Sequence, residues 1–248
     1  MDDLQAVVRA AYKEMSVGTH LERTLWFCAR LREYSLANTL LLIKQTQGRV
    51  RYVQGAAEWS KRFQTSITPS ARSLRIYAPL NEGKDFSIIQ VFDVSDTEMG
   101  GEGPIFKPRL KTTALVNEFA KTQKISLVVN PSQKEPMRFS ATDSRVSINC
   151  AEAEKTFHAL KGICLILLER NKKKGWFKGD LTKAAAISCA FAFEVRCFLQ
   201  EIEGTQLPEA ARKAILSDIK GVLNESHRMA RKAMDKIEEL QVSQMSLK

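Results

Sequence analysis

The sequence predicts an α+β fold, and three observations lead to this prediction. Apolar residues recur every three or four positions near both ends of the chain, which is typical of amphipathic helices. Leu74, Ile76 and Ala78 alternate with polar neighbours, as in a half-buried strand, and residues 86–94 predict a second strand. The second half mixes helices with short strands. We expect those strands at 125–129, 137–141 and 146–150, and the helices at 110–124, 152–170 and 181–202.

Helices are also expected before the first strand. The first runs to about Met15. Thr19 begins the second, and Glu22 three residues later completes a capping-box pattern. Ser35 caps the third helix, whose apolar centre predicts burial. Asn38 lies one turn inside this helix, where its side chain can bond either to its neighbours or to a ligand.

Residues 99–108 hold three Gly and two Pro, which makes them the best candidate for a domain boundary. We therefore expect domains at 1–104 and 105–205, followed by a helical tail at 206–248. Pro208 opens the last helix, an amphipathic one whose apolar residues follow heptad spacing. This seam either docks on its own domain or forms a homodimer.

Composition favours a globular protein with an acidic partner. The 248 residues carry a formal net charge of +10 and a pI near 9.4. Five cysteines, an odd number without CxxC spacing, predict reduced thiols in a cytoplasmic protein rather than disulfides or a zinc knuckle. We expect no signal peptide, because the start MDDLQ has no basic segment followed by an apolar run. We expect no membrane partner, because no apolar stretch reaches the roughly 20 residues of a spanning helix.

Charge is divided sharply along residues 44–106. Residues 44–75 contain seven Lys or Arg against Glu58 alone, whereas residues 76–106 contain Lys84 against six acidic residues. Aromatic residues lie among the cations, and this combination suits a single nucleic-acid strand, whose phosphates need cations and whose bases need stacking surfaces. The predicted phosphate contacts are Arg49, Arg51, Lys61, Arg62, Arg72 and Arg75, and the stacking candidates are Tyr52, Trp59 and Tyr77.

Two of these assignments have alternatives. Trp59 is either a core anchor or a stacking platform. A second basic loop, NKKKGWFKG, either extends the nucleic-acid track or packs its aromatics back onto the helices. Its candidate contacts are Lys172, Lys173, Lys174 and Trp176.

Four pieces of sequence carry a resemblance to a known family. They are Ser35–Asn38 with the following LLLI and Gln45, then Val53–Trp59, then Leu74–Pro79, then Val91–Thr97. Their order and spacing resemble the N-terminal domain of ArdC-type antirestriction proteins. The resemblance implies single-stranded DNA binding and, in the second half, a zinc-dependent peptidase-like domain. The loop at residues 63–70 departs from the Gly/Lys-rich turn of the family.

The second half lacks the peptidase motif that the resemblance implies. In HExxH, two His at i and i+4 hold Zn²⁺ and the Glu activates water. His158 falls on the first ligand position, but Ala159 replaces the general base and Gly162 the second ligand. No acidic residue lies between Asp180 and Glu194. We therefore predict a degenerate zincin-like half with no metal ligand, no cofactor and no peptidase activity.

The leading functional prediction is a non-enzymatic single-stranded DNA-binding protein of a mobile element or phage. It would protect DNA from host defence, a role that rests on the family resemblance. The alternative is a protein-binding inhibitor of a host defence complex, in which the degenerate peptidase fold contacts a host protein.

Overall fold

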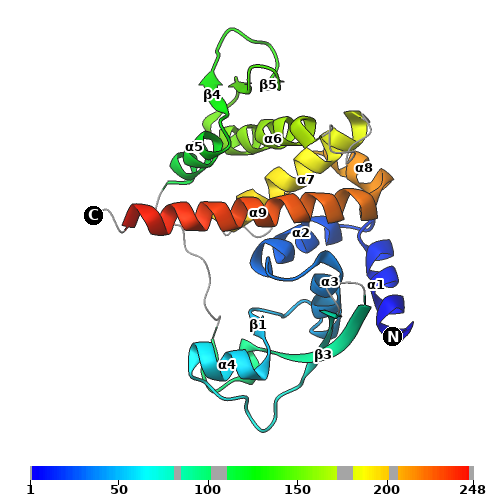
Figure 1. The fold of residues 1–248 in the computed structure, drawn as a ribbon. Coiled ribbons are helices and arrows are strands. Elements are labelled where there is room, and N and C mark those ends of the chain that lie inside the picture. The colour runs from blue at the N-terminus through cyan, green and yellow to red at the C-terminus, as the bar shows by residue number, and fades with distance from the viewer. Residues whose placement is uncertain (1, 81–84, 102–110, 172–180, 201–205, 246–248) are drawn as a thin grey trace. The chain divides into compact units, whose positions relative to one another are not determined.

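The structure is a computed structural model that describes residues 2–80, 85–101, 111–171, 181–200 and 206–245. The chain divides into two compact units, Met1–Ile105 and Phe106–Lys248 (Figure 1). Each unit combines helices with a three-stranded sheet, so the predicted α+β class is confirmed. Among the described residues, no helix is both long and apolar enough to cross a membrane.

The first unit begins with helices α1 (Asp2–Glu14), α2 (His20–Arg30) and α3 (Leu36–Gln45). Strand β1 (Val53–Gln54), helix α4 (Ala56–Phe63), and strands β2 (Leu74–Leu80) and β3 (Asp85–Asp93) follow, and a 3-10 turn (Val94–Asp96) comes next. The predicted Ser35 cap is confirmed, because its hydroxyl accepts from the Asn38 backbone N–H at 3.3 Å. The predicted Thr19 capping box is wrong, since the Thr19 side chain makes no cap hydrogen bond.

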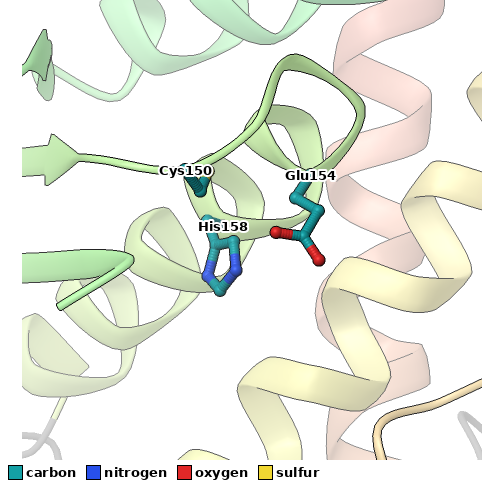
Figure 2. A group of neighbouring side chains, drawn as sticks. All are labelled: Cys150, Glu154 and His158. Carbon is teal, nitrogen blue, oxygen red and sulfur yellow. The ribbon is translucent and has the colours of Figure 1, made fainter.

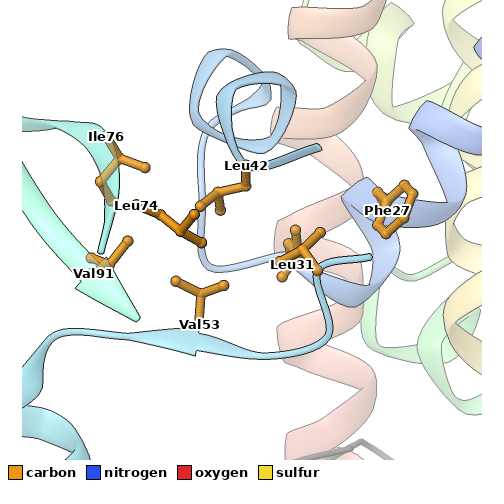
Figure 3. Packing of buried hydrophobic residues seen from close by; sticks show 8 residues of the cluster. Phe27, Leu31, Leu42, Val53, Leu74, Ile76 and Val91 are labelled. Atoms are coloured by element: carbon orange, nitrogen blue, oxygen red, sulfur yellow. The ribbon is translucent and has the colours of Figure 1, made fainter. Parts of the chain in front are cut away.

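The sheet of the first unit is antiparallel, with the order β1-β3-β2. Leu74 and Ile76 of β2 and Val91 of β3 point toward Leu42 of α3 (Figure 3). Phe27, Leu31, Val50 and Val53 complete this core. Strand β2 continues through Pro79, and its pairing with β3 runs to Leu80.

Side chains of α3 cover the outer edge of β2. The Gln45 amide donates to the Arg75 carbonyl oxygen at 2.8 Å and accepts from the Arg75 N–H at 2.9 Å. Asn38, seven residues earlier on the same helix face, bonds the backbone of Tyr77 in the same way. The alternative in which Asn38 serves the fold is therefore the one observed.

The second unit contains a smaller mixed sheet. Helix α5 (Thr112–Thr122) precedes strands β4 (Ser126–Val129), β5 (Met137–Ser140) and β6 (Arg145–Ile148). The central strand β6 pairs parallel with β4 and antiparallel with β5. Helix α6 (Glu152–Asn171) packs on β5 and β6, and helix α7 (Leu181–Gln200) packs on α6.

The last part of the chain forms two helices where the sequence predicted one. Helix α8 (Glu209–Ser217) ends at Asp218, whose carboxylate accepts from the Gly221 N–H at 3.1 Å and starts helix α9 (Ile219–Met245). The heptad residues Leu223, Ala230 and Ile237 are buried, and α9 packs on α5 and α7. The seam therefore docks on its own unit, which is the first of its two predicted alternatives.

Candidate functional site

The predicted phosphate contacts are exposed in the first unit. Arg49, Arg51, Lys61, Arg62, Arg72 and Arg75 all carry exposed side chains. They come from the loop after α3, from the last turn of α4, and from β2 with the residues before it. Exposure leaves them accessible to an anionic partner.

A turn with two aspartates brings part of this set together. Asp93 Oδ2 accepts from the backbone N–H of Arg51 at 2.7 Å and from that of Tyr52 at 3.3 Å. Three residues later, Asp96 Oδ1 accepts from the backbone N–H of Arg72 at 3.4 Å. The two arginines are 21 positions apart in sequence, yet their backbones attach to one short turn. The carboxylates bond main-chain N–H groups, so neither guanidinium is used in these bonds.

A ring cluster lies beside this turn. Tyr52 meets Trp59 at 5.6 Å and Phe63 at 5.7 Å between ring centroids, both edge-to-face. The Arg62 guanidinium lies 5.3 Å from the Phe63 ring centroid. Tyr52 and Phe63 are half-buried. They therefore combine packing against the core with ring surface that remains accessible.

Trp59 does not serve as a stacking platform. Its side chain is 0% exposed, and its indole Nε1 donates to the Phe92 carbonyl oxygen at 3.0 Å. The assignment of Trp59 to nucleic-acid contact is therefore corrected. Phe63, which was not among the predicted contacts, follows Trp59 by one helical turn and is half-buried, so it lies nearer the surface.

Two of the predicted cations contact the end of helix α3 instead of the aspartate turn. The Arg75 backbone bonds Gln45, at the end of α3, and the Arg49 Nε donates to the Thr46 carbonyl oxygen at 3.3 Å. The Arg75 guanidinium also pairs with Asp3 of α1 at 3.4 Å. These contacts attach Arg49 and Arg75 to the C-terminal end of α3, whereas Arg51 and Arg72 attach to the aspartate turn.

The β2–β3 hairpin exposes apolar side chains that the sequence analysis did not select. Phe86 is 52% exposed and meets the Tyr77 ring at 6.4 Å between centroids. Leu80, Ile88 and Ile89 are also exposed. The irregular exposure of β3 explains the omission, because alternation alone would have placed every second residue in the core. The candidates Lys172, Lys173, Lys174 and Trp176 lie outside the described residues.

In the second unit, the start of α6 gathers three potential metal ligands (Figure 2). Cys150 follows β6, and Glu154 and His158 are one helical turn apart. One ligand atom from each lies within 4.8 Å of the others. His158 matches the first HExxH ligand position, but the spacing of Glu154 and His158 at i and i+4 was a further usable signal in the sequence. Cys150 joins them only through the fold.

Burial sets the protonation of this cluster. It lowers the pKa of His158, and the Lys161 ammonium lowers it further, so the imidazole is neutral near pH 7. Burial also raises the pKa of the Cys150 thiol, and the Glu154 carboxylate adds to this effect. His158 Nδ1 is buried without a hydrogen-bond partner. In this cluster, the neutral imidazole of His158 therefore has a buried Nδ1, either a lone pair or an N–H, without a hydrogen-bond partner.

The second HExxH ligand position is filled by packing. A Cβ added at Gly162 would lie 2.5 Å from Val146 Cγ1 and 3.3 Å from the Met137 sulfur. A His side chain does not fit there without moving β6. Cys164, which follows His158 by six residues on α6, is 0% exposed, and burial raises the pKa of its thiol well above its usual value, so this thiol is not a reactive nucleophile.

The nearest acidic residue of α7 is also committed elsewhere. Glu194 is 0% exposed, and its Oε1 lies 2.6 Å from His227 Nδ1 of α9. This buried pair joins α7 to α9. Glu194 is therefore absent from the cluster at the start of α6, where a third peptidase ligand would be needed.

Comparison with known proteins finds a match only among solved structures. No protein-family model and no curated protein sequence matches the chain. The chain is similar to the Mn(II)-bound crystal structure of the antirestriction protein ArdC from plasmid R388, with a TM-score of 0.54 and 15% identity over 96% of this chain and 97% of ArdC. For metal-free ArdC, the TM-score is 0.52 and the identity 14%, over 98% and 99%. The predicted resemblance is thus confirmed in structure, and the chain has an ArdC-like α+β fold.

Proposed function

We propose that the first unit binds single-stranded DNA through a surface made by Arg51, Tyr52, Lys61, Arg62, Phe63 and Arg72, which we name the basic surface. The observation that carries this proposal is the aspartate turn, which joins the backbones of Arg51 and Arg72 next to the ring cluster. Cations beside partly exposed rings suit an unpaired strand, because phosphates and base faces are then bound together.

The biological role that we propose is protection of DNA from host defence in the cytoplasm. The support is the likeness to ArdC, which is an antirestriction protein. The proposed action is binding rather than catalysis. Packing against Val146 at Gly162 and the pairing of Glu194 with His227 support this part, since both positions are unavailable to a peptidase zinc site.

The experiment that tests DNA binding is a titration with labelled oligonucleotides of one sequence, supplied as a single strand and as a duplex. We expect the single strand to bind more tightly, because only unpaired bases can stack on Tyr52 and Phe63. Equal affinity for both forms would contradict the proposal. The isolated protein should be used at full length and free of nucleic acid.

A second candidate function is binding to a host defence protein. The exposed apolar hairpin residues Leu80, Phe86, Ile88 and Ile89 favour it, because apolar side chains on a strand hairpin are typical of protein contacts. A pull-down from nuclease-treated lysate distinguishes the two functions. A direct protein partner survives nuclease, whereas a partner bridged by DNA is lost.

A further inference from the structure

We infer that Cys150, Glu154 and His158 bind one divalent metal ion of the Zn²⁺ class at the start of α6. This inference differs from the sequence-based prediction of no metal ligand. It does not depend on DNA binding, because it concerns only the second unit. Figure 2 shows the three side chains converging from the end of β6 and the first turns of α6.

The geometry is close to that of a bound ion. The ligand atoms lie within 4.8 Å of one another, whereas tetrahedral coordination with bonds of about 2.0–2.3 Å places such atoms about 3.3–3.6 Å apart. Rotation of side chains closes this difference, since Cys150 and Glu154 are not fully buried. The supporting loop is held by Asn149, whose amide donates to the Gln133 carbonyl oxygen at 2.6 Å.

A second observation points to a missing ligand at the same place. His158 Nδ1 is buried and lacks a hydrogen-bond partner, which normally costs about 1–3 kcal/mol. A metal ion bound to one nitrogen of the imidazole would fix the orientation of the ring. The other nitrogen would then carry the proton, which sets the tautomer. The cluster thus explains a buried polar group that the rest of the fold leaves unsatisfied.

The donor set selects the kind of metal. A thiolate and an imidazole with one carboxylate suit Zn²⁺, whereas Mn²⁺ prefers oxygen donors. The thiolate and the carboxylate together balance the charge of a divalent ion. The ArdC crystal structure contains Mn(II). The thiolate and imidazole donors of this chain fit a softer metal than Mn(II).

The fourth coordination position would face a pocket. Glu154 and His158 also line a cavity of about 430 Å³ between α6, α7 and α8. Lys161 and Arg196 border the same cavity. Three protein ligands leave one position open, and the two cations favour an anionic group or hydroxide there. This ion would hold β6, α6 and the pocket wall together without the residues that a peptidase needs.

Cobalt binding tests the inference with a spectroscopic readout. Full-length protein is stripped with chelator and titrated with Co²⁺, then back-titrated with Zn²⁺. We expect one equivalent of Co²⁺ to produce thiolate-to-cobalt charge-transfer absorption, which Zn²⁺ abolishes by displacement. Cys150→Ser should remove this absorption and weaken Zn²⁺ binding by about 100-fold or more, because even outer-shell partners contribute 10- to 100-fold.

Matched variants keep the test decisive. Cys189→Ser changes another thiol that lines the pocket but leaves the cluster intact, so it should bind Co²⁺ like the original protein. Glu154→Gln should keep the charge-transfer absorption and weaken affinity. Three results overturn the inference: no saturable binding at one equivalent, absorption that persists in Cys150→Ser, or tighter binding of Mn²⁺ than of Zn²⁺. Circular dichroism of each variant confirms that it is folded.

Discussion

The side chain of Asn38 forms a two-point hydrogen bond with the backbone of Tyr77. Asn38 Oδ1 accepts from the Tyr77 N–H at 2.9 Å, and Asn38 Nδ2 donates to the Tyr77 carbonyl oxygen at 2.8 Å. Gln45 repeats this arrangement with Arg75. The two amides replace a missing neighbouring strand along the outer edge of β2, so this edge offers fewer free backbone groups for pairing. The strand that carries Tyr77 is thereby fixed to α3.

The first prediction concerns this edge. Asn38→Ala should reduce the free energy of unfolding by about 1–3 kcal/mol, because it leaves the Tyr77 N–H and carbonyl oxygen without their partner. Gln5→Ala, an exposed amide on α1, is the matched control and should change the value by less than about 0.5 kcal/mol. Urea unfolding measures both. Equal stability of the two variants would show that the edge contacts contribute nothing.

The second prediction concerns the contact between α6 and β6. Gly162→Ala should destabilise the protein by about 1–3 kcal/mol through overpacking against Val146, even though Ala is the better helix former. Val146→Ala leaves space at the same point. The double variant should therefore recover stability relative to the sum of the single changes, with a coupling of about 0.5 kcal/mol or more. Strict additivity in thermal or urea unfolding would refute close contact.

The third prediction separates core aromatics from surface aromatics. Trp59→Phe should lower stability by about 1–3 kcal/mol, because the Phe92 carbonyl oxygen loses its buried donor. The folded variant should bind single-stranded DNA with unchanged affinity. Phe63→Ala should instead weaken DNA binding by about 1–3 kcal/mol, as expected for loss of a stacking ring. An affinity loss in Trp59→Phe larger than that in Phe63→Ala would contradict these roles.

The fourth prediction is a pH dependence in the first unit. The Tyr34 hydroxyl donates to the Val53 carbonyl oxygen at 2.8 Å, and burial raises the pKa of this phenol well above its usual 10. The folded state therefore keeps the proton that the unfolded chain releases near pH 10. The stability contributed by neutral Tyr34 is complete below about pH 10 and declines as pH rises above it.

Tyr34→Phe isolates this effect. The difference in unfolding free energy between the original protein and the variant should be constant below about pH 9 and should shrink above about pH 10, by at most about 1.4 kcal/mol per pH unit. Chemical denaturation at a series of pH values measures it. A difference that stays constant up to pH 11 would show that the phenol is not protonated preferentially in the folded state.

Much of the fold follows from sequence because local signals and packing agree. Two local signals each favour one structure strongly, and both predictions were confirmed: the alternation of Leu74, Ile76 and Ala78 favours a strand, and Ser35 favours a helix start. The break at Asp218 was not predicted, because the apolar spacing continues across it and the carboxylate cap depends on the position of α8. Thr19 shows the opposite case, in which a capping pattern exists without the bond.

The candidate site was less accessible to sequence reasoning, since it depends on contacts between distant segments. The basic residues could be selected from charge, but only the bonds of Asp93 and Asp96 show which of them lie together. The same holds for Cys150, which comes close to Glu154 and His158 only because the fold packs β6 against α6. Trp59 had two credible environments, and its burial decides between them.

The salt dependence of single-strand binding tests the central claim most directly. Four cations of the basic surface, Arg51, Lys61, Arg62 and Arg72, predict a slope of log affinity against log salt of about −2.8. The double variant Arg62→Gln/Arg72→Gln should make this slope shallower, at about −1.4. The control Lys134→Gln/Arg145→Gln removes the same charge from exposed positions in the second unit, and it should keep the original slope. Fluorescence anisotropy with a labelled oligonucleotide supplies these values. Identical slopes in all three proteins would contradict the account.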